Sequence, residues 1–299
     1  MARWDRSPAS SIPDWFWQAV ETPSEERFVE VEDCDVCYRV WGGAEAAGKP
    51  GMLLIHGMNA HSRWWDFIAP QLLTDYRVAA MDLTGMGDSD YRYVYEAATY
   101  AREIVSVCDA AGFGSDVAVV GHSFGGVMAV KAANLHPDRF GRLVLVDSGI
   151  RHPDEPPSNQ PLMGGGRPKA YPDRESAENR FRLYPPQPCE NQYITEYIAR
   201  HSLLRVDGGW AWKFDEELPL TTKGTDRTPE DYTGISIPVG IVYGAESRSF
   251  TASTLAYTLE LIGRDVPVAA VENAQHHVFL DQPLAFIGAL KQVLDRLPS

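Results

Sequence analysis

The sequence predicts an α/β protein with a mostly parallel central sheet flanked by helices and an inserted, mainly helical cap. Short apolar runs alternate with helix-like segments, and near-continuous apolar runs are typical of parallel strands buried on both faces. This pattern stops after Ile150 and returns at Ile237. The length of 299 residues and the hydrophobic content of 44% suit one large domain. We therefore expect a core over residues 1–150 and 234–299, and a cap over 151–233.

The N-terminal part predicts one helix and an antiparallel strand pair. The aromatic segment Trp15–Val20 is expected to form a short helix. Residues 28–41 alternate in character, which is the period of half-buried strands. Cys34 and Cys37 lie in this run with a spacing that also occurs in metal sites, but no second pair completes a tetrahedral site. We therefore expect buried strand cysteines and no metal centre.

Buried strands and helices alternate along the rest of the chain. The apolar runs that predict strands are Met52–Ile55, Arg77–Asp82, Val117–Val120, Arg142–Asp147, Ile237–Gly244 and Val268–Val271. The segments that predict helices are Arg63–Leu73, Tyr95–Ala111, 126–133 and, inside the insert, Asn191–Leu204. Strands separated by helices in this way favour parallel pairing.

The most informative motif is the pentapeptide Gly121-His122-Ser123-Phe124-Gly125, which stands between a predicted strand and a predicted helix. A Gly-x-Ser-x-Gly motif in this context is typical of a nucleophile elbow, a tight turn that raises the serine hydroxyl above the sheet. Side chains at Gly121 and Gly125 would collide with the neighbouring strand and helix, so glycine is expected at both. We expect His122 to pack beside the strand without a chemical role.

Two further segments accompany the pentapeptide. Upstream, the predicted strand Met52–Ile55 runs into His56-Gly57-Met58. Downstream, the predicted strand Val268–Val271 precedes His276-His277 and then Asp281. With these segments in this order, the chain resembles the α/β-hydrolase superfamily over nearly its whole length. The resemblance implies the α/β-hydrolase fold and chemistry similar to that of serine carboxylesterases.

The resemblance also implies a nucleophile, a base and an oxyanion hole. Ser123 corresponds to the nucleophile. The catalytic histidine of the family stands five residues before an acidic residue that opens the last helix, which selects His276 over His277. His277 then has a structural or substrate-side role. The oxyanion hole would use the main-chain amides of Met58 and Phe124.

The acid of the triad does not stand where most of the family carries it. After the strand Ile237–Tyr243, Ser247 and Arg248 occupy the usual places, and Glu246 is the only carboxylate nearby. A minority of the family places the acid after the preceding strand, where this chain has Asp147. We expect Asp147 to be the acid, with Glu246 as the alternative; a capping role for Asp147 is the competing interpretation.

For the function, the resemblance favours a serine hydrolase that cleaves a carboxylic ester or lactone of a small molecule through an acyl-enzyme intermediate. A serine nucleophile argues against haloalkane dehalogenases and epoxide hydrolases, which use aspartate. One alternative is a carbon–carbon bond hydrolase of dienone acids, which needs a cationic cap residue such as Arg182, Arg200 or Arg205. Another is a ligand-binding homologue without turnover. No cofactor is implied.

The charge of the chain bears on its partners. The net charge of -14 argues against nucleic acid and anionic membranes, because both demand positive patches. No segment reaches the roughly 20 apolar residues that span a bilayer. Pro13 and Asp14 interrupt the apolar character that a signal peptide would need. We expect a cytoplasmic protein with a small-molecule substrate; an oligomer remains open.

Overall fold

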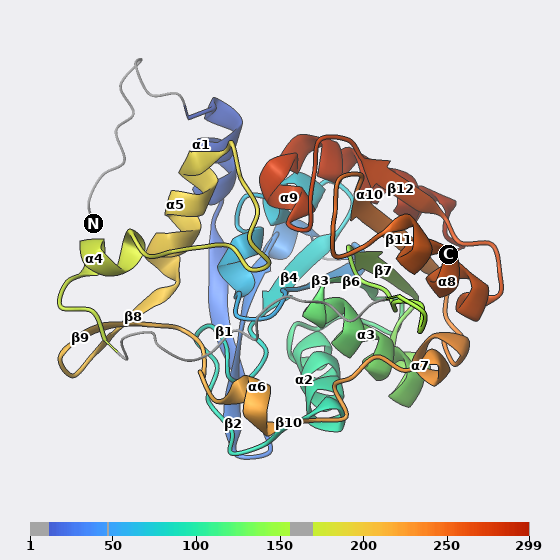
Figure 1. The fold of residues 1–299 in the computed structure, drawn as a ribbon, viewed down its shortest axis with the longest axis horizontal. Coiled ribbons are helices and arrows are strands. Elements are labelled where there is room, and N and C mark those ends of the chain that lie inside the picture. Colours follow the sequence, from blue (N-terminus) through green and yellow to red (C-terminus); the bar gives the residue numbers. More distant parts are fainter. Residues whose placement is uncertain (1–11, 47, 156–169, 299) are drawn as a thin grey trace.

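The computed structural model describes residues 12–46, 48–155 and 170–298. At its centre is a sheet of eight strands in the order β1-β2-β4-β3-β6-β7-β11-β12 (Figure 1). β1 (Ser24–Val31) and β2 (Cys34–Trp41) pair antiparallel, and β2 is antiparallel to β4. The parallel strands are β4 (Arg77–Met81), β3 (Gly51–Ile55), β6 (Ala118–His122), β7 (Arg142–Val146), β11 (Val239–Gly244) and β12 (Val268–Val271). The predicted mostly parallel sheet is confirmed.

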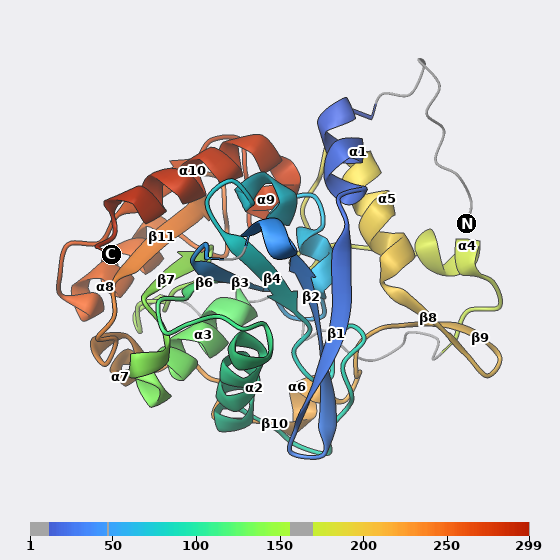
Figure 2. The same cartoon turned by 180° about the vertical axis from the view of Figure 1, so that it is seen from behind.

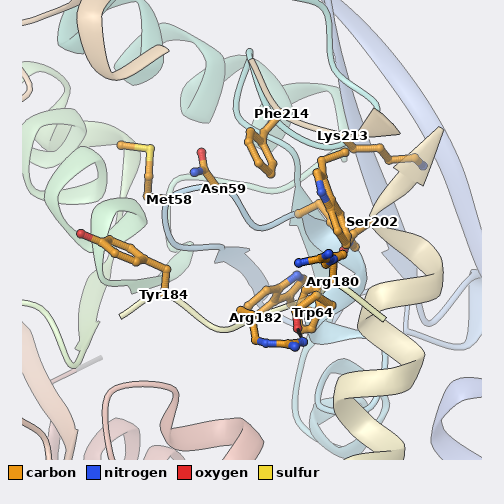
Figure 3. Close-up of a pocket in the computed structure, with 12 residues that line it drawn as sticks. Met58, Asn59, Trp64, Arg180, Arg182, Tyr184, Ser202, Lys213 and Phe214 are labelled. Carbon is orange, nitrogen blue, oxygen red and sulfur yellow. Dashed lines mark hydrogen bonds between the residues drawn. The ribbon is translucent and has the colours of Figure 1, made fainter. Parts of the chain in front are cut away.

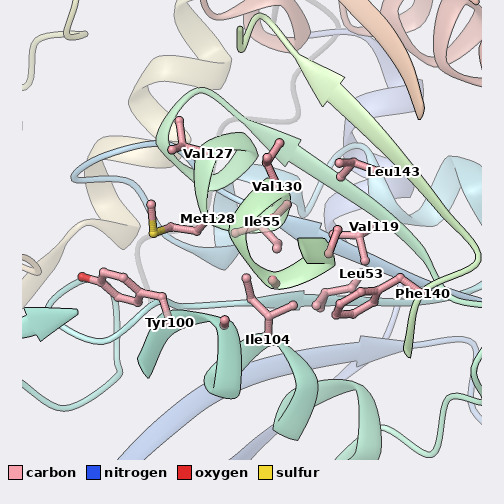
Figure 4. Close-up of a cluster of buried hydrophobic side chains, with 14 of the residues drawn as sticks. Leu53, Ile55, Tyr100, Ile104, Val119, Val127, Met128, Val130, Phe140 and Leu143 are labelled. Carbon is pink, nitrogen blue, oxygen red and sulfur yellow. The ribbon is translucent and has the colours of Figure 1, made fainter. Parts of the chain in front are cut away.

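Helices cover both faces of this sheet (Figures 1 and 2). One face carries α2 (Ala97–Ala110), α3 (Phe124–Leu135), η4 (Pro137–Arg139) and α8 (Ala252–Ile262). The other carries α9 (Val278–Asp281) and α10 (Pro283–Arg296). Successive residues of β3 enter different cores: Leu53 and Ile55 join the first cluster (Figure 4), whereas Met52 and Leu54 join the second. This alternation explains why the strand has no polar position.

The predicted helix over Arg63–Leu73 is wrong. Two 3-10 helices, η2 (Ser62–Trp65) and η3 (Ala69–Leu72), occupy this segment instead. Pro70 stands in the first turn of η3, and proline in a helix interior removes a backbone donor and clashes with the preceding turn. A continuous α-helix therefore cannot cross this position without distortion.

The N-terminal aromatic helix packs on both the core and the insert. In α1 (Asp14–Val20), the buried Phe16 ring lies 5.9 Å from that of Phe67 and 4.9 Å from that of Tyr193 between centroids. A 3-10 turn, η1 (Ala44–Ala46), follows β2. Within the described ranges, no helix has both the length and the apolar character that crossing a membrane requires.

The described part of the insert contains helices and a β-hairpin that the sequence analysis did not predict. The helices are α4 (Arg174–Glu178), α5 (Gln192–His201), α6 (Leu218–Thr221) and α7 (Pro229–Thr233). β8 (Leu203–Val206) and β9 (Gly209–Trp212) form the hairpin, and β10 (Thr222–Lys223) pairs with β5 (Tyr95–Glu96). The helix predicted to Leu204 ends at His201. Residues 156–169 of the predicted insert lie outside the described part.

The two ends of the described insert lie in different places. The hairpin and α4 lie beyond the β1 side of the sheet in both views (Figures 1 and 2). By contrast, α7 lies beside α3, where Lys131 Nζ is 2.9 Å from Asp231 Oδ2. The chain thus returns to the core at α7, before β11.

Candidate active site

Ser123 lies in a strained turn between β6 and α3. Its backbone has φ of 51° and ψ of -115°, a region that residues with a side chain rarely adopt. The amide of Ser123 donates to Val146 O at 3.0 Å, and Ser148 Oγ donates to Ser123 O at 2.8 Å. These bonds to the end of β7 and the residues after it hold the turn in place.

The two glycines of the pentapeptide are required by close backbone approach. A Cβ atom at Gly121 would lie 2.6 Å from the Cα atom of Gly126. A Cβ atom at Gly125 would lie 2.3 Å from the carbonyl oxygen of His56. Both neighbours are main-chain atoms that cannot rotate away, so the turn accepts no side chain at either position.

His276 connects Ser123 to Asp147. Its Nε2 atom lies 3.0 Å from Ser123 Oγ, and its Nδ1 atom lies 2.7 Å from Asp147 Oδ1. Because an ionised carboxylate only accepts, Nδ1 carries the proton and Nε2 presents its lone pair to the serine hydroxyl. His277 is buried beside Trp64, with 5.5 Å between ring centroids. The structure thus directs His276, and not His277, at Ser123.

Asp147 follows β7, and its side chain is fully buried. Oδ1 also accepts from Ser247 Oγ at 2.8 Å, and Oδ2 accepts from the Gly244 amide at 3.0 Å. The Glu246 side chain is exposed and, within the described residues, makes no hydrogen bond to His276. Ser247 stands where an aspartate was sought, and its hydroxyl supports the aspartate of the neighbouring strand. No sequence pattern around Ser247 predicts this role.

Two other buried histidines support the site. The Leu83 amide donates to His56 Nε2 at 3.1 Å, so His56 Nδ1 donates to Gly57 O at 2.7 Å and orients the loop before Met58. Burial lowers the pKa of His56 to about 4, which keeps the ring neutral. His122 Nε2 donates to the main-chain oxygen of His276 at 2.9 Å, and burial lowers its pKa as well.

The predicted oxyanion donors are the main-chain amides of Met58 and Phe124. Met58 lines the cavity above the serine, and Phe124 begins α3 directly after it. Among the described residues, neither amide donates to a protein acceptor. Both amides are therefore left without a protein acceptor in the described part of the chain, and main-chain donors of this kind are what an oxyanion hole uses.

Ser123 and His276 open into a cavity of about 230 Å³. Part of its wall comes from the insert, through Tyr184, Pro185 and Arg227. A second cavity of about 40 Å³ adjoins it and shares the wall residues Met58, Trp64 and Tyr184 (Figure 3). The insert therefore shapes the space next to the serine.

Of the three cap arginines proposed from sequence, one reaches this space. Arg182 lines the second cavity with Arg180 and Lys213 (Figure 3). Arg200 and Arg205 line neither cavity. The Arg205 guanidinium instead lies 5.7 Å from the centroid of the Trp210 ring.

The insert is fastened to the loop that carries His276. Gln187 Oε1 accepts from the His277 amide at 3.0 Å, and Gln187 Nε2 donates to Asp281 Oδ2 at 2.8 Å. The same carboxylate oxygen accepts from the Gln275 amide at 2.7 Å. Burial raises the pKa of Asp281. This acid, which served as the sequence marker for His276, therefore binds the loop and the insert together.

Among known proteins, two hydrolases are similar to this chain over most of their length. An esterase of Mycobacterium tuberculosis is 27% identical over 269 residues, covering 85% of this chain and 85% of the relative. A 2-hydroxy-6-oxononadienedioate/2-hydroxy-6-oxononatrienedioate hydrolase of Cupriavidus pinatubonensis is 28% identical over 285 residues, covering 88% and 90%.

A solved structure and a family model also match this chain. The crystal structure of E-2-(acetamidomethylene)succinate hydrolase matches with a TM-score of 0.74 and 24% identity, over 91% of this chain and 100% of that one. At this identity the likeness concerns the fold. The model of the alpha/beta hydrolase family matches residues 52–289. The chain thus belongs to the alpha/beta hydrolase family.

Proposed function

We propose that this protein is a serine hydrolase that cleaves a carboxylic ester or lactone of a small molecule through an acyl-enzyme intermediate. The observation that carries the proposal is the continuous hydrogen-bonded series from Asp147 through His276 to Ser123. The similarity to an esterase over most of both chains supports hydrolytic activity.

In this mechanism, Ser123 Oγ attacks the ester carbonyl carbon while His276 Nε2 takes the hydroxyl proton. Asp147 stabilises the imidazolium through Nδ1, and the amides of Met58 and Phe124 bind the oxyanion. The imidazolium then gives its proton to the departing alcohol. A water molecule, activated by the same histidine, attacks the acyl-enzyme and releases the acid.

Carbon–carbon bond hydrolysis of a dienone acid is the second candidate. It is favoured by the similarity to the Cupriavidus hydrolase and by Arg182 in the wall of the second cavity, where a substrate carboxylate could bind. A ligand-binding protein without turnover is a weaker candidate, because it would not need a base aimed at the serine hydroxyl.

A hydrolysis screen over esters, lactones, thioesters and dienone acids tests the proposal. We expect turnover of esters or lactones, with a stoichiometric burst of alcohol where deacylation is the slower step. Turnover of dienone acids alone would select the second candidate. Tight ligand binding with no hydrolysis of any class would reject both.

Asp147→Asn is expected to slow ester turnover by roughly 10³- to 10⁴-fold. The asparagine amide would donate to Nδ1 of His276, so that Nε2 would carry the proton and could not accept one from Ser123. The measurement is kcat on an ester found by the screen, with the unfolding midpoint recorded to confirm the fold.

Glu246→Gln is the matched control for this substitution. It removes a carboxylate from the neighbouring loop at a position that makes no hydrogen bond to His276 among the described residues, so a small effect is expected. If Glu246→Gln lowered kcat more than Asp147→Asn did, the acid of the triad would be Glu246 and not Asp147.

A further inference from the structure

Three arginines from three separate loops line the cavity above Ser123. Arg151 follows β7, Arg227 precedes α7, and Arg248 follows β11. Among the described residues of that wall, Asp147 is the only carboxylate, and it already accepts hydrogen bonds from His276, Ser247 Oγ and the Gly244 amide. The whole chain has 41 acidic and 27 basic residues, so the cavity has the opposite charge balance to the chain.

Ser247 fixes the backbone of the loop that carries Arg248. Ser247 Oγ donates to Asp147 and accepts from the amides of Ser249 and Phe250, at 3.2 and 3.1 Å. This hydrogen bonding fixes the loop on both sides of Arg248. Among the described residues, the exposed Arg248 guanidinium has no carboxylate within ion-pair distance, whereas Arg151 Nε lies 3.0 Å from Glu155 Oε2.

The adjoining cavity is also lined by cationic side chains. The described part of its wall includes Arg180, Arg182 and Lys213 and no carboxylate. Two of these cations have protein partners: Lys213 Nζ lies 2.6 Å from Asp88 Oδ2, and Arg182 donates to the carbonyl oxygens of Asn179 and Phe181. Among the described residues that line the two cavities, the cations outnumber the one carboxylate, Asp147, so the space next to Ser123 favours an anion.

We propose that Arg248, assisted by Arg227, binds a carboxylate of the substrate, so that the enzyme selects esters that carry a second, anionic group. A guanidinium suits this task because its planar donors match both oxygens of a carboxylate. The proposal rests on the ester hydrolysis proposed above. The carboxylate can belong to the acyl group or to the alcohol, and the test treats these two sources separately.

Two matched pairs of esters test the selection. For the acyl side, 4-nitrophenyl hydrogen adipate is compared with 4-nitrophenyl hexanoate; for the alcohol side, 4-carboxyphenyl hexanoate is compared with 4-carbamoylphenyl hexanoate. We expect kcat/KM to favour the anionic ester by roughly ten- to hundredfold in at least one pair, which is the range of a charged hydrogen-bonded contact. The favoured pair identifies which side carries the anion.

Arginine variants test which residue is responsible. In Arg248→Gln, the ratio of anionic to neutral kcat/KM should fall toward one, and Arg248→Lys should restore part of it because the charge remains. Arg227→Gln should lower the ratio less. Arg205→Gln is the control, since this insert arginine lines neither cavity, and it should keep the wild-type ratio.

The outcomes separate this proposal from the proposed function. Hydrolysis of neutral esters with a ratio near one in both pairs would overturn the anion site and leave the hydrolase intact. A preference lost in Arg180→Gln but kept in Arg248→Gln would also overturn it, because the anion would then lie in the adjoining cavity. If no ester is hydrolysed, binding of each pair to Ser123→Ala by calorimetry still tests the charge preference, and equal affinities would reject it.

Discussion

Ser123→Ala is expected to lower kcat by roughly 10⁵- to 10⁶-fold while the fold is kept. The alanine removes the only oxygen within hydrogen-bond reach of His276 Nε2 in the described structure, so no covalent intermediate can form. Some acceleration over water should persist, because the substitution leaves the proposed oxyanion donors, the amides of Met58 and Phe124, in place. Single-turnover and steady-state kinetics on an ester from the screen measure both effects.

An organophosphonate gives a second test of the same assignment. It should label Ser123 in the wild type, and mass spectrometry of the digested protein locates the label. Ser249 lines the same cavity, but in the described structure it has no hydrogen bond to His276, so Ser249→Ala should still be labelled at Ser123. A label on any other serine, or full activity in Ser123→Ala, would show that the nucleophile is misassigned.

His276→Ala is expected to reduce kcat by a similar factor, roughly 10⁵- to 10⁶-fold. Without the imidazole, Ser123 keeps its proton during attack and the departing alcohol receives none. The serine and histidine act as one unit, so the double variant should be little worse than either single variant. Steady-state kinetics on all three proteins measure this non-additivity.

His277→Ala is the matched comparison, because it removes the same ring one residue along the chain. That ring packs against Trp64 and His122 and does not bond to Ser123, so a measurable fraction of activity should remain. The unfolding midpoint should fall, since the substitution leaves space in a buried position. Retained activity in His276→Ala together with its loss in His277→Ala would reverse the assignment of the base.

Short-range signals made much of this site predictable. The pentapeptide fixes a turn through steric contacts of its own glycines, and strand ends of a parallel sheet lie at one edge, so Asp147 and His276 could be expected near Ser123. Their placement agrees with that expectation. The sequence at a strand end does not predict which neighbouring group donates a hydrogen bond to the acid. The role of Ser247 is therefore visible only in the structure.

The missed features have different physical origins. The β8–β9 hairpin has a two-residue Asp207-Gly208 turn, a strong hairpin signal that the helical character of the preceding segment obscured. The three arginines in the wall of the cavity above Ser123 could not be predicted. Arg151, Arg227 and Arg248 belong to no common motif, and only the folding of three distant loops brings them to one wall.

The bridge made by Gln187 has a practical consequence for protein engineering. A chimera that exchanges the whole insert for that of another hydrolase would also discard the side chain that joins His277 to Asp281. Asn191, whose amide donates to the Leu280 carbonyl at 2.8 Å, would be lost with it. Crossover points placed after Asn191 would let a library vary the rest of the insert. Every member would then keep the hydrogen bonds of Gln187 and Asn191 to the loop that carries His276.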